Sequence, residues 1–162
     1  QSGSNGQEET QRFHLNPRSG RWLADHSHLQ RHVNLAIAYN VWQYFQVTGD
    51  LPFLRHHGAE LIVECARLFS SLATYDEERH RYDILGVLGP DEYHDAYPDR
   101  DEPGLDNNAY TNVMTAWLMR MALDTMDVLP THQRTELRDE LVAWERSRTA
   151  IESVLRAQPR ST

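Results

Sequence analysis

Hydrophobic residues recur at helical spacing in four stretches of the chain, so that each stretch would carry its apolar side chains on one face of an α-helix. The first stretch begins at Leu29. Ser27 is a residue type that caps helix starts, and Gly49 ends the run. The sequence therefore predicts a helix from Leu29 to the residue before Gly49. Its apolar positions are Leu29, Val33, Ile37, Val41, Tyr44 and Phe45.

A second predicted helix follows after almost no linker. Asp50 is placed to cap it, and Pro52 falls in its first turn, where the missing N–H of proline costs nothing. Because the link at Gly49 is so short, the two helices must fold back on each other as an antiparallel hairpin. The apolar face of the second helix contains Leu54, Leu61, Ile62, Cys65, Phe69 and Leu72.

A third helix is predicted over residues 108–129, before Pro130, and a fourth over about residues 131–157. Residues 1–27 show no period and are expected to be loop, with a short turn at residues 16–20. Residues 75–106 are rich in Asp, Glu, Gly and Pro, far longer than the ~2–8 residues that usually connect helices in bundles, and are expected to form an ordered, functional loop. The predicted fold class is all-α, with helices in antiparallel pairs.

Composition and charge exclude several classes of partner. The net charge of −8, from 16 basic and 24 acidic residues, is opposite to that of proteins that grip phosphate backbones, so nucleic acid is not expected as a partner. No apolar stretch approaches the ~20 residues needed to span a bilayer, and no signal peptide is visible. The single cysteine, Cys65, permits no internal disulfide and favours a cytoplasmic location. The chain opens on a polar, glycine-containing segment without Met, which favours an internal fragment of a longer protein.

Candidate chemistry gathers in the run Gly89-Pro90-Asp91-Glu92-Tyr93-His94. Cleaving a glycosidic bond requires a carboxylic acid that is still protonated near neutral pH. Burial against aromatic groups and a like-charged neighbour both raise the pKa of a carboxyl group, and Asp91, Tyr93 and His94 would supply that setting to Glu92. The alternative is a simple turn or helix cap, for which Pro-Asp-Glu is common.

This run and a second one resemble glycoside hydrolase family 65, which contains maltose, trehalose and kojibiose phosphorylases and some trehalases. The second run is Leu105-Asp106-Asn107-Asn108-Ala109-Tyr110-Thr111-Asn112, and residues 1–9, 14–22 and 29–39 are similar to the same family. The resemblance covers residues 1–129, whereas residues 130–162 are expected to form a C-terminal helix and tail with weak resemblance.

The resemblance implies that the helices are consecutive hairpins of an (α/α)6 barrel, with the acidic loop on its substrate face. It assigns Glu92 as the general acid of an inverting cleavage of α-linked glucose disaccharides such as trehalose or maltose. The nucleophile is inorganic phosphate, as co-substrate, in a phosphorylase and an activated water in a hydrolase; no cofactor is implied. Asp91, Tyr93, His94, Asn107, Asn108 and His32 are the expected substrate-binding residues.

Other family motifs, a Trp-Asp pair upstream and a Lys-Gln segment and phosphate loop downstream, are not found in this chain. The isolated chain is therefore expected to be inactive. The alternative from another class is a non-catalytic helical remnant or partner-binding module, whose exposed hairpin edges would favour self-association.

Three further patterns leave alternatives open. His28 and His32, four residues apart on one predicted helix face, could bind zinc, but no His-Glu-x-x-His pattern or paired Cys supports a metal site, so none is expected. The acidic residues of 95–106 do not match a calcium loop and favour a solvated surface. The amides of Asn108 and Asn112 could read sugar hydroxyls, or Asn107 or Asn108 could cap the third helix.

Overall fold

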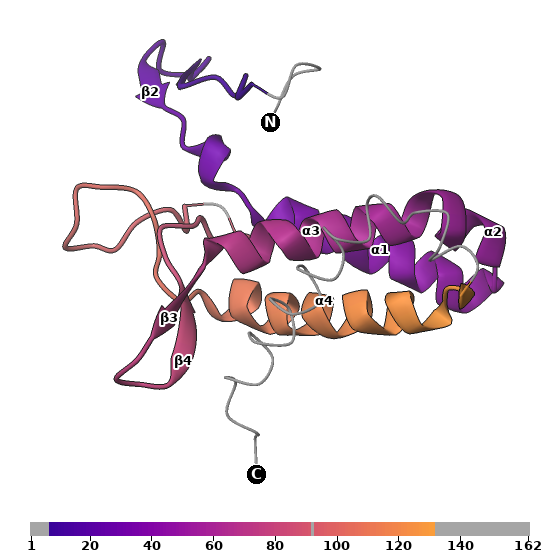
Figure 1. Cartoon of the computed structure of the whole chain (residues 1–162). Helices are drawn as coiled ribbons and strands as arrows, with labels where there is room; N and C mark the ends of the chain where they lie inside the picture. Colours follow the sequence, from indigo (N-terminus) through magenta and orange to yellow (C-terminus); the bar gives the residue numbers. More distant parts are fainter. Residues whose placement is uncertain (1–6, 92, 132–162) are drawn as a thin grey trace.

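The computed structural model describes residues 7–91 and 93–131, and its N-terminal part is a small β-hairpin (Figure 1). Strand β1 (Phe13–Leu15) pairs antiparallel with β2 (Trp22–Ala24), with Phe13 opposite Ala24 and Leu15 opposite Trp22. The predicted turn at residues 16–20 joins them. The Asn16 side chain accepts hydrogen bonds from the amides of Arg18 and Ser19, and Gly20 takes the left-handed conformation, with φ of 65°.

Helix α1 (His32–Thr48) starts later than its sequence pattern predicts. Ser27 does not cap it: residues Ser27–Leu29 form a separate 3₁₀ turn, η1, whose start has no side-chain cap. Its end is as predicted, since Gly49 adopts a left-handed φ of 65° and its amide donates to the Phe45 carbonyl.

The second helical stretch is continuous but changes pitch. Asp50 caps α2 (Leu51–Phe53) by accepting from the Phe53 amide at 3.0 Å, as predicted, and Pro52 lies in that first turn. A π-helical turn, η2 (Leu54–Gly58), then leads into α3 (Ala59–Leu72). Gly58 is buried where this turn meets α1: a Cβ there would lie 3.0 Å from a Val41 methyl group.

Helix α3 returns alongside α1, and α4 (Ala109–Val128) runs back beside both, so α1 and α4 begin at the same end of the molecule (Figure 1). Buried side chains of all three helices form one core, which the strand residue Ile84 and the loop residue Val87 complete. Its fully buried large side chains include Leu35, Leu54, Ile62, Val63, Phe69, Leu118 and Met119. The packed helices thereby fix the end of the molecule where α1 and α4 begin and α3 finishes, and the segment between α3 and α4 lies at this end.

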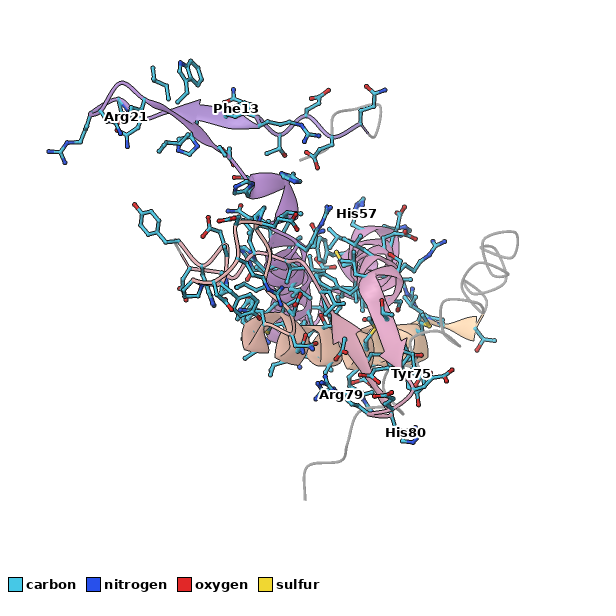
Figure 2. All side chains as sticks on the ribbon, turned by 90° about the vertical axis from the view of Figure 1, so that its left-hand side faces the viewer. Phe13, Arg21, His57, Tyr75, Arg79 and His80 are labelled. Carbon is cyan, nitrogen blue, oxygen red and sulfur yellow. The ribbon has the colours of Figure 1, made fainter. Side chains whose placement is uncertain are left out.

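The predicted all-α class, in which the helices are hairpins of an (α/α)6 barrel, is wrong: the fold is mixed, and the described residues contain two small antiparallel sheets. Besides β1–β2, strand β3 (Ala73–Asp76) pairs with β4 (Arg81–Ile84) directly after α3. Tyr75 and Tyr82 face each other across this pair with ring centroids 5.1 Å apart, a cross-strand aromatic contact that stabilises so short a hairpin. The two hairpins project on opposite sides of the helices (Figure 2).

The two remaining predicted helices have different outcomes. The third helix is confirmed, with Asn108 as its N-cap and Leu129 just after its end. The fourth, predicted over residues 131–157, lies outside the described residues except for Thr131. Over residues 7–91 and 93–131, the helices are too short or too polar to cross a lipid bilayer.

Candidate functional site

The candidate site lies at the end of the molecule where α1 and α4 begin. The chain between β4 and α4 crosses this end, and the Leu88 amide donates to the Leu29 carbonyl at 3.1 Å, which ties the crossing segment to the turn before α1. Leu88 is itself buried. The run that begins at Gly89, singled out in the sequence, therefore follows directly after a residue bonded to the turn before α1.

The base of this loop is fastened by a short ladder of backbone bonds. Val87 and Leu105 exchange both hydrogen bonds, at 3.1 and 2.8 Å, and the Asn107 amide donates to the Ile84 carbonyl at 2.8 Å. Gly104 allows two segments of the loop to cross closely, because a Cβ on it would lie 2.8 Å from the Gly86 Cα. Its buried-type residues Ile84, Val87 and Leu88 are buried in the structure.

The turn at Gly89 closes on itself. The Gly89 amide donates to the His94 carbonyl at 2.8 Å, and the His94 amide donates to the Asp91 carbonyl at 3.3 Å. The His94 imidazole lies over Gly89, because a Cβ at that position would stand 2.2 Å from its Nδ1. Gly89 therefore leaves the space that the ring of His94 occupies, and His94 is fixed relative to the turn.

Glu92 lies outside the described residues. Of the neighbours expected to surround it, Asp91 and His94 are exposed, and Tyr93 is 93% exposed with a left-handed φ of 61°. All three residues are thus accessible to solvent, although the His94 ring also lies against Gly89. A left-handed tyrosine is uncommon, and such backbone conformations occur frequently at functional sites.

Asn107 and Asn108, neighbours in the second motif, make different hydrogen bonds. The Asn107 side chain accepts from the Ile84 amide at 3.1 Å and from the Asn112 side chain at 3.2 Å, and donates to Asp83 at 2.9 Å. It joins β4 to α4, and its φ of 53° is tolerated by asparagine better than by most residues. The Asn108 Oδ1 caps α4 by accepting from the Thr111 amide at 3.1 Å, the structural alternative that the sequence left open.

His32 lies at the start of α1 and packs edge-on against Tyr110 of α4, with ring centroids 6.5 Å apart. Its Nδ1 is buried and has no hydrogen-bond partner among the described residues, and the same holds for Oδ1 of Asn112. The structure therefore brings His32 and the asparagine run to the same helix starts. Unpaired buried polar atoms are uncommon and suit groups that a ligand completes.

The two histidines of the zinc alternative lie on different elements. His28 belongs to η1 and His32 to α1, so the two do not share a helix face. Asp25 is engaged elsewhere: hydrogen bonds from Ser27 hold the pKa of Asp25 below its ordinary value, and His14 Nδ1 lies 3.5 Å from its carboxylate. Within the described part of the chain, no group of three His, Cys, Asp or Glu side chains is arranged to hold a metal ion.

Sequence reasoning missed one cluster in the loop. Tyr97, Arg100 and Asp106 contact one another, although their spacing in the sequence matches no catalytic motif. Asp106 was visible as part of the second motif. The signal for its partners is weak: Arg100 is the only lysine or arginine between Arg81 and Arg120, in a segment crowded with carboxylates.

The glycosyl hydrolase family 65 central catalytic domain matches residues 1–156. The chain belongs to glycosyl hydrolase family 65. An uncharacterized glycosyl hydrolase of Mycobacterium tuberculosis is 50% identical over 96% of this chain, and trehalose 6-phosphate phosphorylase of Lactococcus lactis is 47% identical over 72% of it. The suspected family is thus confirmed.

This family-65 chain spans 12% and 15% of the lengths of those two relatives. A solved chain from the human microbiome, described under the name kojibiose phosphorylase, superimposes on 76% of this chain and 17% of its own length, with a TM-score of 0.61. At 21% identity this likeness concerns the fold alone.

Proposed function

We propose that this chain is the acid-bearing part of an inverting α-glucoside phosphorylase or hydrolase, with Glu92 as the general acid. The observation that carries the proposal is the family-65 match over residues 1–156, which includes the Gly89–His94 run on a loop tied at its base above the starts of α1 and α4. α-Linked glucose disaccharides such as trehalose or maltose are the proposed substrates.

In the proposed reaction Glu92 gives its proton to the oxygen that bridges the two sugars. The bond from the anomeric carbon to that oxygen breaks, while a nucleophile attacks the same carbon from the opposite face, so the configuration inverts. Inorganic phosphate would yield a glucose 1-phosphate, whereas water, activated by a second carboxylate, would yield free glucose. The phosphorylase named among the relatives supports phosphate as the co-substrate.

The remaining candidate residues take roles that their places suggest. Asp91, Tyr93 and His94 are exposed on the acid-bearing turn and are proposed to contact the sugar or Glu92. Asn107, Asn108 and His32 are proposed to contact the substrate, and Asn107 also joins β4 to α4 through its hydrogen bonds. For His32 the support is its place at the start of α1, where it packs against Tyr110 beside the asparagine run.

The role of Glu92 is tested by Glu92→Gln in a protein that carries this chain at the full length of its relatives. The amide keeps the size of the side chain but cannot donate a proton to the leaving oxygen. Turnover of trehalose, trehalose 6-phosphate and maltose, each with and without phosphate, should fall by roughly 10²–10⁴-fold, the usual contribution of a general acid.

The control is an α-glucosyl fluoride, whose leaving group needs little protonation. It should be turned over by Glu92→Gln at a rate close to that of the unsubstituted protein. Unreduced turnover of the disaccharides by Glu92→Gln would refute the assignment.

The same assays on the unsubstituted protein distinguish the two nucleophiles. Product formation that requires phosphate would identify a phosphorylase, and product formation in the absence of phosphate would identify a hydrolase.

A further inference from the structure

The Tyr97 hydroxyl brackets the backbone of Asp106. It accepts a hydrogen bond from the Asp106 amide at 3.1 Å and donates one to the Asp106 carbonyl at 3.1 Å. One side-chain oxygen thus uses both its donor and its acceptor capacity on a single residue across the loop. Tyr97 is partly buried, so this pair of bonds is shielded from competing water.

The Asp106 side chain is held from two further directions. Its Oδ1 accepts from the Gly86 amide at 3.2 Å, and its Oδ2 accepts from Arg100 Nη1 at 3.0 Å. The Arg100 guanidinium also lies over the Tyr97 ring, 4.8 Å from its centroid, in a cation–π contact. Tyr97, Arg100 and Asp106, here called the loop latch, therefore form a closed set of contacts at the base of the loop.

The acid-bearing turn is anchored by a backbone bond at each end, and the loop latch follows directly after the second anchor. Before the turn, the Leu88 amide is bonded to the Leu29 carbonyl. After the turn, the Gly104 amide donates to the Asp95 carbonyl at 2.6 Å, and Tyr97 follows two residues after Asp95. The described residues 89–91 and 93–94 therefore lie between these two anchored points.

From this geometry we infer that Tyr97 and Asp106, with Arg100 pinning them, are positioning residues for the proton-donating turn. None of them is proposed to contact the substrate. A general acid works only within hydrogen-bond reach of the oxygen that it protonates, and displacement by about 1 Å can cost about 10²-fold in rate. A loop so rich in carboxylates would otherwise separate by charge repulsion, and Arg100 is the cation that opposes it.

The inference rests on the proposed role of Glu92, and Tyr97→Phe in the relatives' full-length context tests it. Phenylalanine keeps the ring under Arg100 but removes both bonds to Asp106. Disaccharide kcat should fall roughly 10-fold with KM nearly unchanged, since the loss concerns proton donation and not binding. Turnover of an α-glucosyl fluoride should stay within about twofold, because that leaving group barely uses the acid.

Matched variants separate the latch from general damage. Tyr75→Phe removes a hydroxyl contact to His80 within the β3–β4 hairpin, and Arg120→Gln breaks an ion pair of 3.0 Å on α4; both should behave as the unsubstituted protein. Arg100→Gln should reproduce the leaving-group dependence of Tyr97→Phe.

The outcomes distinguish the positioning role of the loop latch from the proposed role of Glu92. If Glu92→Gln shows the leaving-group dependence and Tyr97→Phe and Arg100→Gln do not, the latch inference is overturned while the proposed function stands. Equal losses on disaccharide and fluoride in the latch variants would show a structural role only and would also overturn it. Undiminished disaccharide turnover in Glu92→Gln would remove the basis of both.

Discussion

Cys65 shows how the environment of a single residue sets its reactivity. Its side chain lies on α3 against the core, and burial, followed by the neighbouring Glu64 carboxylate, raises the pKa of the Cys65 thiol to about 11. Because the thiolate is the nucleophile, the folded protein should react slowly with a disulfide reagent at pH 8. The raised pKa also means that this group favours the folded state below the unfolded pKa, a contribution lost as the pH rises through the folded value.

The measurement compares the rate of thiol labelling at pH 8 between the native protein and the protein unfolded in urea. Labelling should be fast only after unfolding. A Cys65→Ala/Ser71→Cys variant, which moves the thiol to an exposed position on the same helix, should label quickly in both states. Rapid native labelling of Cys65 would contradict the buried environment described for it.

Neighbouring asparagines show what a residue's type can predict. The capping of the third helix by Asn108 was predictable, since asparagine is a preferred N-cap and the apolar period starts directly after it. The clamp made by Asn107 was not, because its partner Ile84 is 23 residues away along the chain and is brought near only by the fold. The motif indicated that Asn107 matters, and the structure shows the bonds that it makes.

At the scale of elements, the crossing of Gly86 and Gly104 is the contact on which the loop base depends. Gly104→Ala would place a Cβ 2.8 Å from backbone that cannot rotate away, at a φ of 121° that an L side chain rarely adopts. Strain of about 1–3 kcal/mol, with the clash in addition, should open the base. Amide hydrogen exchange at Val87 and Leu105, which bond each other, should accelerate in a family-65 protein carrying the substitution.

Gly49→Ala is the control for this substitution. Gly49 also has a positive φ, of 65°, but a Cβ there meets nothing within 4 Å. It should cost only about 1 kcal/mol and leave the exchange of Val87 and Leu105 unchanged. Equal protection of those two amides in Gly104→Ala and the unsubstituted protein would show that the crossing does not hold the loop.

The errors in predicting elements have a common physical origin. Strands β1 to β4 are three or four residues long, too short for an alternating pattern to appear above the noise of the sequence. Their pairing is decided by turns and cross-strand contacts. The π-helical turn η2 is equally invisible, since the local apolar spacing still resembles an α-helix. The long helices were predictable because their pattern is repeated over many turns.

For the whole molecule, the exposed faces of the helices differ in kind. The exposed positions of α3, namely Glu60, Glu64, Arg67 and Ser71, are polar, as on an outer surface. Helix α1 buries Leu35, Ala38 and Trp42 on one side but exposes apolar residues on the other, namely Val33, Ile37, Tyr44 and Val47. These four, here called the α1 stripe, include Val47 at 83% exposure. Because the relatives are far longer than this chain, we expect their additional segments to cover the stripe.

The α1 stripe should therefore drive self-association of the 162-residue chain when it is prepared alone. Ile37→Lys with Val47→Lys should shift its sedimentation toward the monomer. Ser71→Lys with Thr74→Lys adds the same charge on exposed polar positions and should leave association unchanged. In a protein of the relatives' length the Ile37 and Val47 lysines should instead lower the unfolding temperature, because covering segments would bury unpaired charge at a cost of several kcal/mol. A monomeric unsubstituted chain, or full tolerance of both lysines at full length, would show that the stripe is an ordinary solvent-facing surface.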